Sequence, residues 1–79
     1  MKENKWKKLK KHNDLEQDKL QDKNQSYIGK VVKILCVKNM SLLEIEIIRR
    51  DLIGMATEIQ LVGESIENRL GEPTEFARN

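Results

Sequence analysis

The 79-residue chain has little of what usually reinforces a small domain. It has one cysteine, Cys36, and one histidine, His12, which excludes an internal disulfide and a Cys/His zinc site. No apolar run approaches the ~20 residues that span a bilayer. One proline, four glycines and an aromatic content of 4% favour helices over β-structure. We therefore expect one all-α domain with a limited core, for which self-association is a common way to gain buried area.

The single cysteine and histidine also bear on chemistry and location. One free thiol and no signal peptide lead us to expect a reducing cytoplasm. Cys36 lies on an apolar segment and is predicted to be a small buried side chain, the alternative being a thiol activated by Lys33. His12 has no nucleophile nearby, and Leu9 stands where a di-iron Glu-x-x-His pair needs its glutamate. We expect no enzyme, no cofactor, no metal and no small-molecule substrate.

The clearest helical signal covers residues 41–62. Ser41 and Glu44 have the spacing of a capping box, and Gly63 stands where a left-handed residue ends a helix. The apolar residues of this segment recur every three or four positions, which places them on one stripe. They are Leu42, Ile45, Ile48, Leu52, Met55, Ile59 and Val62. We expect the rest of the chain to pack on this helix.

The acidic residues of this helix are interpreted as structural or solvated. Glu44 completes the cap, whereas Glu46 and Asp51 are predicted on the solvent-facing side. Glu46 stands four residues before Arg50, the spacing of an ion pair on a helix surface.

Two helices are predicted before the central one. Residues 3–22 lack glycine and proline and carry only a narrow apolar stripe of Trp6, Leu9 and Leu20, so this helix should lie on the outside. Residues 24–26 offer caps, and residues 25–37 show helical spacing. Their β-branched run also permits a strand, but a lone strand would have no partner. The short connector 38–40 makes this helix an antiparallel neighbour of the central one.

The tail predicts two short helices. Ile66 and Leu70 stand four residues apart, Gly71 supplies a second left-handed position, and Pro73 begins the last helix. Phe76 is the one large apolar residue of that helix and is expected to close the end of the core. Ile66, Leu70 and Phe76 should all pack back on the central helix.

The tail resembles the HAAS-type helical domains of bacteria. The shared pattern is a glycine and polar cap at 63–65, the Leu-Gly-acid-Pro turn at 70–73 and an apolar-alanine pair at 76–77. The span from 6 through 50–52 to 77 is also similar to a related family of small all-helical bacterial proteins of unknown function. Members of both are often encoded beside PadR-type helix-turn-helix repressors. The resemblance implies a superhelical arrangement of short helices. We expect no attached membrane segment or DNA-binding domain, which would leave any signalling role to partners in trans.

The net charge of +2 hides an asymmetry between the two halves of the chain. Residues 1–40 hold eleven lysines against five acids, which is +6, and residues 41–79 hold four arginines against eight acids, which is −4. Either the two halves attract each other, within one chain or across a dimer, or a basic arm meets an acidic partner.

These observations favour a non-enzymatic protein-binding accessory or regulatory module, whose partner is a second copy or another protein. The contact residues we predict lie in the basic start: Trp6, Lys5, Lys7, Lys8, Lys10 and Lys11. Trp6 has the alternative role of closing the core, and the lysines that of a solvated face. The second hypothesis is a small nucleic-acid-binding protein that uses the same lysines, and a membrane surface is a third. No arginine stands in this stretch for bidentate phosphate contacts or base reading.

Overall fold

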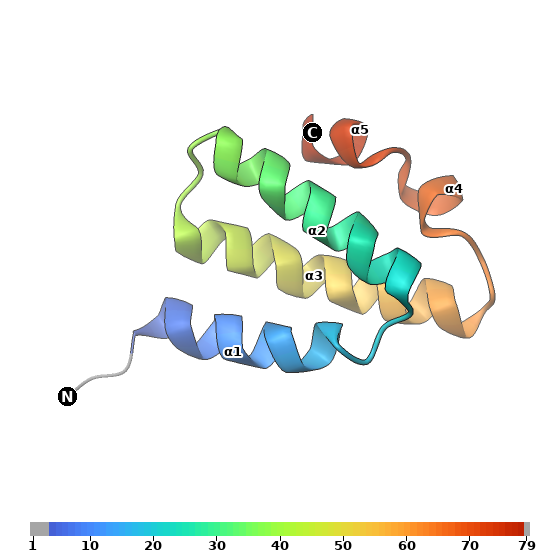
Figure 1. The fold of residues 1–79 in the computed structure, drawn as a ribbon, viewed down its shortest axis with the longest axis horizontal. Helices are drawn as coiled ribbons and strands as arrows, with labels where there is room; N and C mark the ends of the chain where they lie inside the picture. The colour runs from blue at the N-terminus through green and yellow to red at the C-terminus, as the bar shows by residue number, and fades with distance from the viewer. Residues whose placement is uncertain (1–3, 79) are drawn as a thin grey trace.

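The computed structural model describes residues 4–78, which form five helices and no strand (Figure 1). The three longer helices are α1 (Lys5–Gln17), α2 (Asp22–Val37) and α3 (Leu42–Leu61). Two short helices follow, α4 (Ile66–Leu70) and α5 (Pro73–Arg78). The predicted all-α class, with three main helices and a tail of two short ones, is confirmed.

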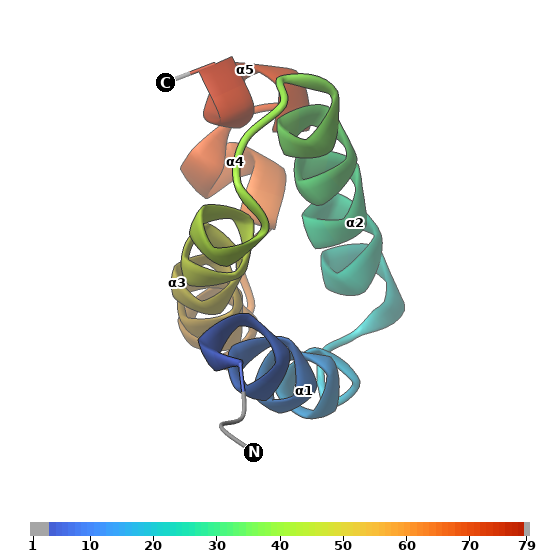
Figure 2. The same ribbon diagram turned by 90° about the vertical axis from the view of Figure 1, so that its left-hand side faces the viewer.

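Helices α2 and α3 form the middle of the molecule and run antiparallel, as the short connector predicts. Helix α1 packs on α3 at one side, α5 packs on α2 at the other, and α4 contacts both α3 and α5 (Figure 2). The tail thus differs from the expectation in that α5 packs mainly on α2, although Phe76 and Ala77 still line a pocket with Ile48 of α3. The chain reverses after α4, and this carries α5 across to α2.

The core is built mainly from α2 and α3, whose apolar stripes face each other. Its buried apolar residues are Leu20, Tyr27, Ile28, Val31, Leu35, Ile45, Leu52, Ile53, Ala56, Ile59, Ile66 and Ala77. Leu70 and Phe76 lie half-buried at its edge, as does Ile48. Leu42 and Val62, the two ends of the predicted stripe, are exposed because they lie on the terminal turns of α3, beyond its neighbours.

Both predicted ends of α3 are confirmed. The Ser41 hydroxyl accepts a hydrogen bond from the Glu44 backbone N–H at 3.2 Å and donates one to the Glu44 carboxylate at 2.9 Å. At the other end Gly63 has a φ of +74°. The N–H of Gly63 donates to the carbonyl of Gln60, and that of Glu64 to the carbonyl of Ile59, the pair of bonds that defines a Schellman motif.

The boundary between the first two helices differs from the prediction. Helix α1 ends at Gln17, a turn follows, and α2 begins at Asp22, three residues before the predicted start. Leu20 lies in that turn, where it is 6% exposed and reaches the core from outside any helix. Glu3, the predicted first residue of the helix, lies outside the described residues, and Asn4 caps α1 by accepting from the Trp6 N–H at 3.0 Å.

The turn between α4 and α5 depends on Gly71. Its φ of +83° is positive as predicted, but its ψ of −176° is extended and not left-handed helical. That region is open to glycine alone. The carbonyl of Gly71 accepts a hydrogen bond of 2.7 Å from the Tyr27 hydroxyl, which joins the turn to α2.

Candidate partner-binding surface

A buried polar cluster attaches α1 to α3. The Asn13 side-chain amide donates to the Glu46 backbone carbonyl at 2.9 Å and to the Glu46 carboxylate at 3.0 Å. The Arg49 guanidinium pairs with the same carboxylate at 3.0 Å. Glu46 is therefore not on the solvated face that was predicted for it, and its partner is Arg49 rather than Arg50. A buried carboxylate is tolerated here because it has both an amide donor and a cation.

Arg49 extends the cluster along α1. Its guanidinium donates to the Gln17 side chain at 2.9 Å and pairs with Asp14 at 2.7 Å, and Asp14 also pairs with Lys10 at 3.0 Å. Burial alone raises the pKa of Asp14, but the hydrogen bonds and positive charges of Arg49 and Lys10 outweigh it and hold that pKa below its ordinary value. The one signal in the sequence for this cluster was Asn13, a polar residue between Trp6 and Leu20 on the narrow apolar stripe.

A second polar contact joins the start of α2 to α3. The Gln60 side-chain oxygen accepts hydrogen bonds from the Gln21 backbone N–H and the Asn24 amide, both at 2.9 Å. Asn24 is buried inside the first turn of α2. The prediction that residues 24–26 cap this helix is therefore wrong for Asn24. Residues further along α1 bond to residues further along α3, so the two helices are parallel and their register is fixed. This register decides which side of α1 faces outward.

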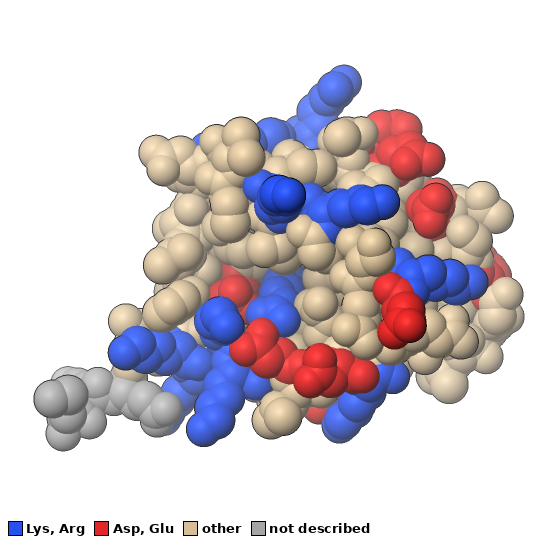
Figure 3. Space-filling view, in the orientation of Figure 1, with Lys and Arg blue, Asp and Glu red and all other residues tan. Residues whose placement is uncertain are grey.

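The predicted contact residues divide between two sides of α1. Trp6 is half-buried and precedes Asn13 by seven residues and Gln17 by eleven, so it shares their side and faces α3. Lys7, Lys8 and Lys11 lie on the opposite side and are exposed. Basic side chains gather at this end of the molecule in Figure 3. Trp6 therefore lies on a different side of α1 from Lys7, Lys8 and Lys11. Lys10 forms an ion pair with Asp14.

Leu15 completes the outward face of α1. It lies four residues after Lys11 and seven after Lys8, and it is 61% exposed. His12 is exposed on the same helix. We call Lys7, Lys8, Lys11 and Leu15 the outward face of α1. It combines positive charge with one large apolar side chain and has no catalytic arrangement.

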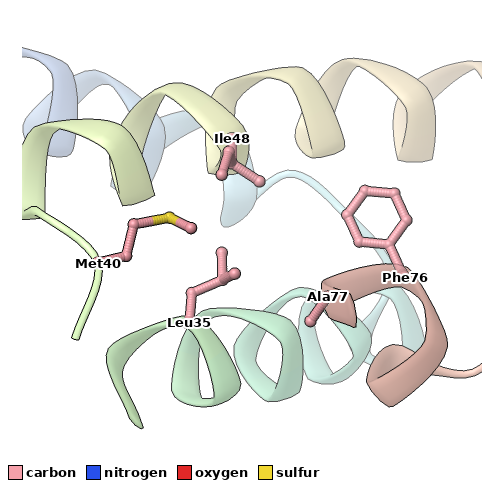
Figure 4. Close-up of a pocket in the computed structure, with 5 residues that line it drawn as sticks. All are labelled: Leu35, Met40, Ile48, Phe76 and Ala77. Atoms are coloured by element: carbon pink, nitrogen blue, oxygen red, sulfur yellow. The ribbon is translucent and has the colours of Figure 1, made fainter. Parts of the chain in front are cut away.

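An apolar pocket lies between α2, α3 and α5 (Figure 4). Its volume is about 380 Å³, and its side chains point toward a common space. They are Leu35 from α2, Met40 from the connector, Ile48 from α3, and Phe76 and Ala77 from α5. With no charged or polar side chain in its lining, this pocket suits an apolar group and offers no acid or base.

The residues considered for chemistry are scattered. Cys36 is exposed on the last turn of α2, contrary to its predicted burial, because Leu35 takes the core-facing position beside it. Within residues 4–78, no three His, Cys, Asp or Glu side chains gather as a metal ion requires. Over the same residues, no helix has both the length and the apolar character to cross a bilayer.

Comparisons of the chain with protein-family models, with curated proteins and with solved structures found no match.

Proposed function

We propose that the protein is a non-enzymatic protein-binding module, accessory to or regulating another protein, and that it binds an acidic partner through the outward face of α1. The observation that carries the proposal is the position of Leu15, 61% exposed, next to Lys8 and Lys11 on one side of a helix. A large apolar side chain left in water beside cations fits a partner that offers both an apolar contact and carboxylates.

The way α1 is held supports this role. Its inner side is tied to α3 by Asn13, Asp14 and Gln17, so the outward side is presented in one fixed orientation. A surface that is ordered before binding loses little conformational entropy when a partner arrives. Lys5 is exposed at the first residue of the same helix and extends the proposed contact at its edge, whereas Trp6 faces α3 and lies outside it.

The resemblance to HAAS-type domains supplies the first partner to try. Because relatives of that type are often encoded beside PadR-type repressors, we propose a transcriptional regulator, or a membrane protein encoded nearby, as the partner class. Localisation in the cytoplasm follows from this proposal and is part of it.

The test compares co-purified proteins from cells that naturally produce this chain. The variant Lys7→Glu/Lys8→Glu/Lys11→Glu reverses the charge of the outward face. The control variant is Lys30→Glu/Lys33→Glu, because both of these lysines are exposed on a different helix, α2. We expect a defined acidic protein to be retained by the wild type and by the control and lost by the triple variant. The purified pair should then bind with the same pattern. An identical set of proteins for all three forms would contradict the proposal.

The second candidate is nucleic-acid binding by the same lysines. Lysines that neutralise phosphates bind DNA with an affinity that falls steeply with salt, whatever the sequence. Two observations disfavour nucleic-acid binding: the apolar Leu15 lies within the outward face of α1, and α1 contains no arginine. Titration with random duplex DNA at low salt decides: salt-dependent binding that the triple variant abolishes would replace the protein-binding proposal, and no binding would eliminate the DNA candidate.

A further inference from the structure

Within residues 4–78, no other helix covers the side of α3 that faces away from α2 (Figure 2). Five residues on this side are exposed and stand at positions arranged symmetrically about a glycine. They are Ile47, Arg50, Gly54, Glu58 and Leu61. The steps of three and four residues between them form one stripe along the helix. We call these five residues the outer stripe of α3.

Nothing inside the molecule accounts for Gly54 at the centre of this stripe. It lies in the middle of a helix, its φ is not positive, and a Cβ atom placed on it would have no atom within 4 Å. A glycine at such a position weakens a helix relative to alanine. Close approach of another backbone is one physical reason for glycine at such a position. Gly29 in α2 is equally open, so the argument for Gly54 depends on the residues that flank it.

The residues on either side of Gly54 are complementary to one another. Arg50 and Glu58 stand four residues before and after it, and Ile47 and Leu61 stand seven before and after. If two α3 helices cross antiparallel at Gly54, Arg50 of one copy meets Glu58 of the other, and Ile47 meets Leu61. Each contact then occurs twice, as two-fold symmetry requires. A parallel crossing would instead oppose arginine to arginine and glutamate to glutamate.

The charges of this stripe are available for such a contact. Glu58 is exposed, and no ion pair joins it to another residue of 4–78. Arg50 is 54% exposed at its side chain and reaches only the neighbouring Asp51, at 3.4 Å. The exposed apolar ends of the stripe, Leu61 at 81% and Ile47 at 37%, gain burial in the same crossing.

From these observations we propose that the outer stripe of α3 binds a second copy of this chain in an antiparallel, two-fold crossing centred on Gly54. Because α1 runs parallel to α3, the crossing also places the lysine-rich end of one copy along the acid-rich end of the other. This arrangement agrees with the net charges of +6 for residues 1–40 and −4 for residues 41–79. A single helix-helix crossing is a small interface, so the dimer should depend on concentration. The outer stripe is distinct from the outward face of α1, and this inference goes beyond the proposed function.

The first test is sedimentation equilibrium over about 10 µM to 1 mM, the range for weak but specific association. Arg50→Glu or Glu58→Arg alone places like charges in both contacts, and each should shift the chain to monomer. The double swap Arg50→Glu/Glu58→Arg restores opposite charges in the antiparallel crossing alone and should recover the dimer. Lys30→Glu on α2 is the control and should leave the wild-type distribution unchanged. A wild type that stays monomeric throughout, or single variants that dimerise like it, would overturn the proposal.

The second test locates the crossing. In a Cys36→Ser background, Ile47→Cys/Leu61→Cys keeps Gly54 and the charged residues and puts the new thiols of the two copies opposite each other, so mild oxidation should give a covalent dimer. Glu44→Cys, on the exposed first turn of α3 and away from the axis, should give none. A chain that sediments as a dimer but fails to cross-link through positions 47 and 61 would place the interface elsewhere and overturn this inference. Because Lys7→Glu/Lys8→Glu/Lys11→Glu leaves the outer stripe intact, it should still form the dimer where partner binding is lost, with a weaker association because the attraction between the two halves is reduced.

Discussion

The amide of Asn13 in α1 donates to both the backbone carbonyl and the carboxylate of Glu46 in α3, at 2.9 and 3.0 Å. Asn13 is 1% exposed and Glu46 is 6% exposed, so this contact takes a charge into the interior. The apolar stripe of α1 is narrow, and apolar contacts alone would leave its register on α3 weakly defined. The directional bonds to Glu46, together with the Arg49 pair, specify one register.

The first prediction is that Glu46→Ala destabilises the protein by about 1–3 kcal/mol, because it removes the buried carboxylate that Arg49 and Asn13 share. Asn13 then keeps only its bond to the backbone carbonyl, and Arg49 its bonds to Gln17 and Asp14. Urea unfolding followed by circular dichroism measures this loss. Glu44→Ala is the matched control, since Glu44 is exposed at the first turn of the same helix, and its cost should stay within about 1 kcal/mol. Equal losses for the two variants would show that the cluster adds no more than a surface cap.

The second prediction concerns acid. The pKa of Asp14 is raised by burial and lowered more strongly by Arg49 and Lys10, so in the folded chain it lies below its unfolded value. The charged form is therefore favoured by folding. Its contribution to stability is present above the unfolded pKa, near pH 4, and is lost as the pH falls through the folded pKa.

Asp14→Asn removes this contribution while keeping the size of the side chain. We expect the variant to lose stability at pH 7, and to lose less than the wild type when the pH is lowered from 7 to 3. Urea unfolding at the two pH values gives the comparison, with Asp51→Asn on the exposed side of α3 as control. A variant that keeps the full acid sensitivity of the wild type would refute the assignment to Asp14.

Local signals explain why α3 and the tail could be predicted from sequence. Ser41, Glu44 and Gly63 act through bonds to residues within five positions, so a short stretch contains all the information needed. The first boundary failed because Leu20 continued the apolar spacing of α1 although it lies in a turn. Leu20 is buried because of its position between α1 and α2, and a local sequence pattern does not predict this position.

The candidate surface was harder to predict because it depends on tertiary register. Glu46 has the sequence context of a surface residue, and only the approach of Asn13 from 33 positions away makes it a buried acceptor. Trp6 and Lys8 are two residues apart in the basic stretch, yet they point to different sides once α1 is packed on α3. The composition indicated a basic contact helix but did not indicate which side of it faces outward.

The third prediction concerns Tyr27, whose hydroxyl donates to the Gly71 carbonyl at 2.7 Å. Burial chiefly, and then the negative charges of Glu67, Glu72 and Glu75, raise the pKa of this phenol above its ordinary value. Folding thus favours the neutral form. The associated stability is complete below the unfolded pKa, near 10, and is lost as the pH rises through the folded pKa.

Because Tyr27 is the one tyrosine in the sequence, its ionisation can be followed directly by absorbance at about 295 nm. The native chain should ionise at higher pH than the same chain in denaturant. Tyr27→Phe should remove the signal and cost about 1 kcal/mol at neutral pH for the lost hydrogen bond. Identical titration of the native and denatured chains would mean that the phenol is not buried beside Glu67, Glu72 and Glu75.

The last prediction compares alanine at two glycines. Gly71 has a φ of +83° and an extended ψ, a region that other residues enter at a cost of roughly 1–3 kcal/mol. Gly29 lies in α2 with nothing within 4 Å of an added Cβ, and there alanine should stabilise the helix by roughly 0.5–1 kcal/mol. The same chemical change should therefore shift the thermal midpoint in opposite directions. Since the Gly71 turn also presents the acceptor for Tyr27, Gly71→Ala should in addition bring the ionisation of that tyrosine back toward its ordinary pH. A shift of the midpoint without this change in titration would mean that the turn moves while its bond to α2 persists.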